Sequence, residues 1–192
     1  VLLHGKDVSR LQAPQLARSG GARTFQNIRL IPGATVLDNV MIGFHRAEAA
    51  GMLNNLFGLA GARREMAHLR DEAMLLLERF GMGALAAHRA GGLSYGHQRR
   101  IEMMRALAAS PSVLLLDEPV AGMNDAEAEE LADIFRAVAQ QGVAILLIEH
   151  NMRFVTSLCS QVYVLASGRL IAQGTADSVG RDPRVVEAYL GA

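Results

Sequence analysis

Two patterns of apolar positions divide the chain into helical and strand segments. Between Arg63 and Phe80, apolar residues recur every three or four positions, which predicts an amphipathic helix with one buried face. The runs Val113–Leu116 and Val143–Ile148 are continuously apolar, which is typical of strands covered on both faces of a sheet. Asp125–Gln141, between them, returns to helical spacing. This strand–helix–strand order predicts a parallel sheet with helices packed outside it.

Each predicted helix carries a row of apolar side chains that we expect to be buried. In the first helix these residues are Met66, Leu69, Ala73, Leu76, Leu77 and Phe80. In the second helix they are Leu131, Ile134, Phe135 and Val138. Both rows follow the spacing of one helical face.

Turn signals lie near both ends of the chain. "VLLHGKDVSRLQ" predicts a strand and a turn at Gly5-Lys6-Asp7, and "YVLASGRLIAQG" predicts a hairpin around Ser167-Gly168. We therefore expect an α/β chain with three regions. Residues 1–26 are the end of a β-rich lobe, 27–109 a helical subdomain, and 110–192 an α/β core.

Composition narrows the range of functions. The 19 basic and 19 acidic residues give no net charge, and there is no Trp, so nothing favours a nucleic-acid partner. A single cysteine, Cys159, cannot form an internal disulfide, which favours a reduced, cytosolic setting. The longest apolar runs are far shorter than the roughly 20 residues that span a bilayer.

The segment "VLLLDEP" places two carboxylates at the end of a predicted buried strand. In open α/β sheets, ligands bind at the carboxyl ends of strands. Asp117 could hold Mg²⁺ on a nucleotide, and Glu118 could orient or deprotonate a water molecule. The alternative is an ordinary strand end followed by a polar turn, which Pro119 would terminate.

The segment "LSYGHQRR" has the features of an anion site. Ser94 and Gly96 would offer a hydroxyl group and backbone N–H groups at the start of a helix, where the helix dipole favours negative charge. A capped helix with Ile101, Met104, Leu107 and Ala108 facing the core explains the same residues. Ser94 precedes Asp117 by 23 residues, which leaves room for one helix, one turn and one strand.

Two further polar residues occupy suggestive places. His150 follows the second apolar strand as Asp117 follows the first, so we expect both at the same edge of the sheet, where the imidazole could bind a phosphate oxygen. Gln26 closes the first region, and its amide could contact Mg²⁺ or the attacking water. Taken alone, each could be an ordinary loop residue.

Together, in this order, the motifs resemble the nucleotide-binding subunits of ABC transporters over essentially the whole chain. "RTFQ" is similar to the Q-loop, "LSYGHQ" to the signature LSGGQ, and "VLLLDEP" to Walker B. "AGMN" is similar to the D-loop and "IEHNM" to the switch-histidine segment. "TVLDNVMIG", "GARRE" and "DEPVAGMN" resemble more narrowly the ATP-binding subunits of branched-chain amino acid importers.

The resemblance implies a P-loop NTPase fold of the ABC type, and it implies roles for matching residues. Asp117 would bind Mg²⁺, Glu118 would be the catalytic base, and His150 would contact the γ-phosphate of ATP. Gln26 would sense Mg²⁺ and couple to a permease. Ser94 and Gly96 would bind ATP held by a second ATPase subunit, and Asn124 would assist across that dimer.

The resemblance also implies partners and a location. The subunit would work with two transmembrane permeases and, indirectly, a periplasmic binding protein, on the cytoplasmic face of the membrane. The permeases would dock on the helical surface between Asn27 and about Leu93.

The chain departs from the family pattern in two places. His97 stands where the signature usually has Gln, and no G-x-x-x-x-G-K-[ST] loop (Walker A) is present in the 192 residues. Because Val1 opens within a predicted strand, we expect the chain to lack its beginning. By itself it should neither bind ATP tightly nor hydrolyse it, and it should expose a sheet edge and apolar surface.

Two alternatives stay open from the sequence. The chain could be an ABC-type domain that has lost hydrolysis and serves as an assembly or regulatory partner. It could also be an ATPase for another cargo, such as urea, other amides or a lipopolysaccharide-type export substrate, because the cargo never touches this subunit.

Overall fold

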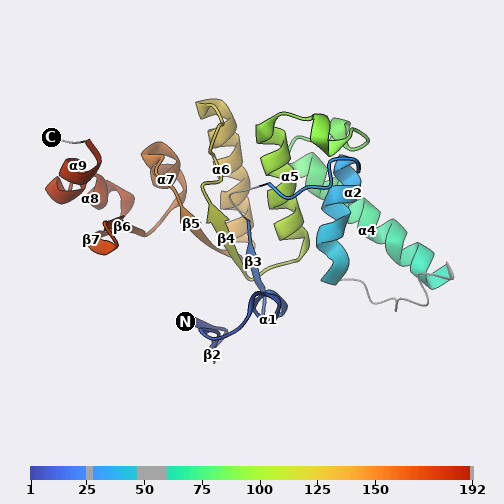
Figure 1. Cartoon of the computed structure of the whole chain (residues 1–192), viewed down its shortest axis with the longest axis horizontal. Coiled ribbons are helices and arrows are strands. Elements are labelled where there is room, and N and C mark those ends of the chain that lie inside the picture. The colour runs from blue at the N-terminus through green and yellow to red at the C-terminus, as the bar shows by residue number, and fades with distance from the viewer. Residues whose placement is uncertain (25–27, 47–59, 191–192) are drawn as a thin grey trace.

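The centre of the fold is a parallel three-stranded sheet, seen in a computed structural model that describes residues 1–24, 28–46 and 60–190. Its strands lie in the order β3 (Gly21–Arg23), β4 (Val113–Asp117) and β5 (Ala144–Ile148) (Figure 1). Val113 pairs with Ala144 at one end of β4, and Asp117 pairs with Ile148 at the other. The parallel sheet predicted from the two apolar runs is confirmed, and the carboxyl ends of β4 and β5 meet at one edge.

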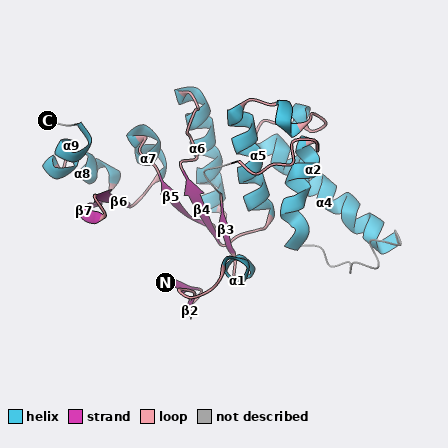
Figure 2. Ribbon diagram, viewed as in Figure 1, coloured by secondary structure: helices cyan, strands magenta, loops and turns pink. Residues whose placement is uncertain are grey.

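Several helices pack with the sheet to form the main hydrophobic core (Figure 2). They are α2 (Val36–Met41), α4 (Ala60–Arg79), α5 (Tyr95–Ala108) and α6 (Asp125–Gln140). Leu114 and Leu116 of β4 are buried in this core with Ile101 of α5 and Phe135 of α6. One hydrophobic cluster therefore spans the helical region and the sheet, and the division of the chain into three regions stays a prediction.

The remaining elements are short. At the N-terminus they are β1 (Leu2–Leu3), β2 (Lys6–Asp7) and α1 (Ala13–Arg18). Among the described residues, 3₁₀ turns cover Ile42–Arg46, Gly83–Leu85 and Ala90–Gly92. After β5 come α7 (Met152–Leu158), β6 (Val162–Ala166), β7 (Arg169–Gly174), α8 (Ala176–Gly180) and α9 (Pro183–Leu190). The hairpin predicted at Ser167-Gly168 joins β6 to β7 and is confirmed. The hairpin and the last two helices share a second, smaller cluster.

Side-chain caps determine where the helices next to the sheet begin. Ser94, Asn124 and Asn151 each accept a hydrogen bond from a backbone N–H in the first turn of α5, α6 and α7, respectively. These bonds satisfy donors that the helix itself leaves free. Asn124 and Asn151 follow the loops that leave β4 and β5, so these two caps fix the starts of α6 and α7 close to the strand ends.

Two local predictions are wrong. Met66 was expected on the buried face of α4 but is exposed, because the buried positions of that helix begin only at Leu69. The N-terminal turn is centred on His4 and Gly5 rather than on Gly5-Lys6-Asp7. Both central residues of this hairpin turn have positive φ, which matches the twist of the flanking strands, and Lys6 and Asp7 therefore lie in β2.

The expectation that the second apolar strand is covered on both faces is also wrong. Leu146 and Ile148 of β5 are 60% and 64% exposed, whereas the intervening Leu147 packs on the main core. Within the described residues no strand pairs with the outer edge of β5. The prediction that the chain exposes an unpaired strand and apolar surface is therefore met at β5. No described helix is long and apolar enough to cross a membrane.

Candidate functional site

Glu118 and His150 meet at the edge where β4 and β5 end. The Glu118 carboxylate Oε1 lies 3.6 Å from the His150 Nδ1. The His150 side chain is 69% exposed and that of Glu118 is 35% exposed, so both can reach a ligand in solvent. The structure thus brings together a carboxylate and an imidazole that are 32 positions apart in the sequence, as the parallel strands predict.

Glu118 leaves the strand in a strained backbone conformation. Its φ is +45°, in the left-handed region that residues other than glycine rarely adopt. Its N–H donates to the Ile148 carbonyl at 2.9 Å, so the first residue beyond β4 is still tied to β5. The left-handed turn separates the direction of the Glu118 side chain from that of Asp117.

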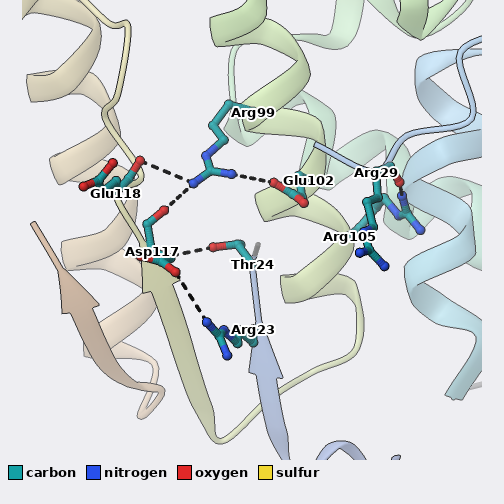
Figure 3. A network of polar contacts seen from close by, with 8 residues as sticks. All are labelled: Arg23, Thr24, Arg29, Arg99, Glu102, Arg105, Asp117 and Glu118. Carbon is teal, nitrogen blue, oxygen red and sulfur yellow. Dashed lines mark hydrogen bonds and ion pairs between the residues drawn. The ribbon is translucent and has the colours of Figure 1, made fainter. Parts of the chain in front are cut away.

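Asp117 lies on the other side of this strand end, beside β3. Its Oδ2 is 3.4 Å from an Arg23 guanidinium nitrogen, and its backbone N–H donates to the Thr24 hydroxyl at 3.5 Å (Figure 3). The Thr24 N–H in turn donates to the Leu115 carbonyl at 3.0 Å. Thr24 thus holds the chain beside Asp117 two residues before Gln26, which itself lies outside the described residues.

Glu149 is a polar residue of this edge that the sequence analysis did not single out. Its side chain is only 1% exposed, and its carboxylate accepts from the backbone N–H groups of Val120, His150 and Asn151 at 2.9 to 3.2 Å. These bonds hold the loop after β4 against the loop after β5. A carboxylate directly after an apolar strand was the available signal, as it was for Asp117.

The start of α5 is an exposed helix terminus with a hydroxyl at its first position. The Ser94 hydroxyl accepts from the His97 N–H at 3.4 Å and lies 3.0 Å from the His97 Nδ1. A Cβ added at Gly96 would meet no atom within 4 Å, so the backbone is open to a ligand there. His97, the departure from the usual signature, therefore contacts the Ser94 hydroxyl through both its backbone N–H and its ring.

The loop before α6 lies next to this terminus. Gly122 has a φ of +74°, and a Cβ added there would lie 3.4 Å from the Tyr95 ring. Asn124 caps α6: its Oδ1 accepts from the Glu127 N–H at 3.0 Å, and the Glu127 carboxylate accepts from the Asn124 N–H. The side-chain Oδ1 of Asn124 therefore has a structural role as a helix cap.

The side chains at the carboxyl ends of β4 and β5 suit a metal ion that arrives bound to a ligand better than a permanently bound metal ion. Among the described residues, no group of three or more His, Cys, Asp or Glu side chains could hold a metal ion. Mg²⁺ usually binds one or two carboxylates together with waters and substrate phosphates. Asp117 offers one such carboxylate, and its ion pair with the half-exposed Arg23 is of a kind worth only about 0–1 kcal/mol.

Comparison with known proteins points to one family. The model of the ABC transporter family matches residues 1–121, and the model described as branched-chain amino acid ATP-binding cassette transporter matches residues 169–192. The high-affinity branched-chain amino acid transport ATP-binding protein LivG of Escherichia coli is 36% identical over the whole chain, which covers 75% of LivG. BraF of Pseudomonas aeruginosa, which bears the same description, is also 36% identical, with the same shares covered.

Solved structures agree with the sequence relatives. The crystal structure of a nucleotide-free ATP-binding cassette from an ABC transporter is 30% identical, with a TM-score of 0.78 over 98% of this chain and 75% of that one. An ATP-binding cassette in its ADP conformation gives the same TM-score at 31% identity, over 97% of this chain and 74% of the other. The chain belongs to the ABC transporter family, in the group of ATP-binding proteins of branched-chain amino acid transport.

Proposed function

We propose that this chain serves in an ATP-hydrolysing subunit that energises an importer of branched-chain amino acids. The observation that carries the proposal is the convergence of Glu118 and His150 at the sheet edge formed by Asp117 and Ile148. The cargo is supported by the printed names of LivG and BraF.

Asp117 is the candidate ligand for Mg²⁺, through water, once nucleotide replaces the weak contact to Arg23. Bound Mg²⁺–ATP supplies the phosphoryl group and neutralises part of its developing charge. Gln26 is the further candidate contact to Mg²⁺, and it lies outside the described residues. Thr24 supports this assignment, because its contact with Asp117 brings the chain that leads to Gln26 close to the candidate Mg²⁺ ligand.

Glu118 is the candidate general base. Its partly exposed carboxylate can accept a proton from a water molecule that attacks the γ-phosphate. His150, 3.6 Å from that carboxylate, can donate a hydrogen bond to a γ-phosphate oxygen. Positioning and charge stabilisation of this kind supply most of the catalysis in phosphoryl transfer.

Ser94 and Gly96 are the candidate contacts to ATP held by a second ATPase subunit. The open backbone at Gly96 and the exposed start of α5 support this role, because free N–H groups and the helix dipole favour an anion. Asn124 is the candidate residue to assist across the same dimer, which the packing of its loop beside Tyr95 supports. Permease subunits and, through them, a periplasmic binding protein complete the proposed assembly on the inner face of the membrane.

The test replaces Glu118 by Gln in the parent protein, meaning the product of the complete coding sequence that includes these residues. The parent is needed because the 192 residues contain no G-x-x-x-x-G-K-[ST] loop. Glu118→Gln should reduce ATP hydrolysis by about 100-fold or more, because the base is lost, while ATP still assembles a stable dimer. Steady-state ATPase assays and size-exclusion chromatography with ATP measure the two effects.

The control is Glu187→Gln, which changes an exposed carboxylate on α9 and should leave both readouts as in the wild type. Hydrolysis by Glu118→Gln at the wild-type rate would refute the assignment of the base. Deletion of the gene should reduce leucine uptake by the host, with rescue by the wild type but not by Glu118→Gln. Unchanged leucine uptake would instead favour another cargo.

A further inference from the structure

Arg99, in the first turns of α5, is a fully buried arginine to which the proposed chemistry assigns no role. Its side chain has no exposed surface, and one guanidinium nitrogen lies 2.8 Å from the Glu102 carboxylate, which is itself buried. The other terminal nitrogen donates to the backbone carbonyl of Asp117 and, at 3.4 Å, to that of Glu118 (Figure 3). A buried cation needs a paired anion and satisfied donors, and this one obtains them partly from the end of β4.

These contacts fix the peptide group that joins Asp117 to Glu118. Its carbonyl accepts from Arg99 of α5, and its N–H donates to the Ile148 carbonyl of β5 at 2.9 Å. Both polar ends of the peptide are therefore held by two elements other than β4. Because the plane of this peptide sets φ of Glu118, the two bonds hold that residue at +45°. Such a conformation is strained and persists only where the surroundings enforce it.

We propose that Arg99 is a positioning residue for hydrolysis: it holds the Asp117–Glu118 peptide so that the Glu118 carboxylate faces His150. Arg99 comes three residues after Gly96 on the same helix, about 4.5 Å further along its axis. The helix whose start binds the partner's nucleotide thus also sets the catalytic carboxylate of its own subunit. The inference rests on the proposed function, because it assigns Arg99 a part in that same site.

The test compares Arg99→Met and Arg99→Lys in the parent protein, with kcat and KM for ATP as readouts. Arg99→Met should lower kcat by about 10- to 100-fold, because a small misplacement of a catalytic group is that costly. KM should stay within a factor of about two, because the bonds by which Arg99 holds the site join it to backbone carbonyl groups and to Glu102 of the protein itself. Arg99→Lys should have a kcat between those of the wild type and Arg99→Met. A lysine ammonium group can reach one carbonyl, but it cannot bind the carbonyls and Glu102 at the same time as the planar guanidinium group does.

Arg100→Met provides a matched control on the same helix. Arg100 is also buried, but its guanidinium donates to the Phe80 carbonyl at 3.3 Å and to Glu130 at 3.1 Å, away from the catalytic peptide. It should lower the melting temperature while kcat per folded molecule stays at the wild-type value. An equal loss of kcat in both arginine variants, or a loss of stability alone in Arg99→Met, would show that Arg99 is merely structural.

The double variant with Glu118→Gln separates the two proposals. Once the base is absent its positioning no longer matters, so Arg99→Met should cause no further loss of hydrolysis in that background. Wild-type turnover by Glu118→Gln overturns the proposed function itself, whereas an inactive Glu118→Gln beside a fully active Arg99→Met overturns only the positioning role. If Arg99→Met yields no folded protein, Arg99→Lys decides: reduced kcat at unchanged KM supports the role, and wild-type kcat removes it.

Discussion

At the residue scale, Gly96 allows the proposed phosphate site to be changed without disturbing the fold. An added methyl group would meet no atom of the chain within 4 Å, and alanine favours a helix by about 0.5–1 kcal/mol over glycine. We expect Gly96→Ala to keep or raise the melting temperature. In the Glu118→Gln background it should abolish the ATP-dependent dimer, because the methyl group stands where a phosphate approaches the helix start. Thermal unfolding and size-exclusion chromatography with ATP measure these effects.

Gly61→Ala is the control for that experiment, since Gly61 also lies in a helix and is also open, but far along the sequence from the site. It should leave the dimer intact. A dimer that forms normally with Gly96→Ala would place the phosphate contact elsewhere. A large fall in melting temperature would show instead that the space at Gly96 is not free.

The residues of the site differ in how far the sequence could predict them. The meeting of Glu118 and His150 follows from two apolar strands that each end in polar residues, because parallel strands bring their carboxyl ends together. Arg99 gave a weaker signal: it shares a helical face with Met103, four positions on, and both are fully buried. The proposed effect of Arg99 on the site depends on its bond to the backbone carbonyl of Asp117, 18 residues away, which no local sequence pattern predicts.

At the element scale, the start of α6 separates two roles of Asn124. Its Oδ1 caps the helix, so Asn124→Ala should lower stability by about 1 kcal/mol, or about 2–4 °C in melting temperature. Asn124→Asp keeps the capping oxygen and should restore stability. Because aspartate lacks the amide N–H₂ group, this variant should still show reduced ATPase activity if the side chain acts across the dimer. Full activity in Asn124→Asp would leave Asn124 with the capping role alone.

Elements with strong periodicity were predictable, and those that depend on distant partners were not. The strands β4 and β5 and the helices α4 and α6 follow from apolar spacing alone. By contrast, β3 is only three residues long and becomes a strand because Gly21, Ala22 and Arg23 pair with β4. Likewise, α2 is a six-residue helix whose Val36 and Val40 are wholly buried against distant helices.

At the scale of the whole molecule, the two sides of β5 should respond in opposite ways to the same substitution. Leu146→Thr replaces an exposed apolar side chain, so in the 192-residue chain it should reduce self-association and dye binding without loss of stability. Leu147→Thr, on the side that packs on the core, should lower the free energy of unfolding by about 1–3 kcal/mol. Light scattering, binding of the apolar dye ANS and denaturant unfolding distinguish them.

Equal destabilisation by the two variants would mean that the Leu146 side of β5 is covered after all. Unchanged scattering with Leu146→Thr would mean that the exposed apolar face does not drive association. The strand as a whole shows the limit of reading burial from composition. A continuous apolar run predicts that other segments pack on both faces of the strand. The run itself does not show which segments these are.

The bonds that shape the end of β4 also bear on when the enzyme can start to consume ATP. The Asp117 N–H contacts Thr24, 93 positions earlier, its carbonyl contacts Arg99, and the next N–H contacts Ile148. Closing the chain over such separations has an entropic cost, and these bonds can form only once β3, α5 and β5 are all in place around β4. If Arg99 has the proposed positioning role, a chain that is still being synthesised, or that has folded only in part, holds no fixed peptide to orient Glu118. Such a chain should therefore consume ATP slowly without any dedicated inhibitor.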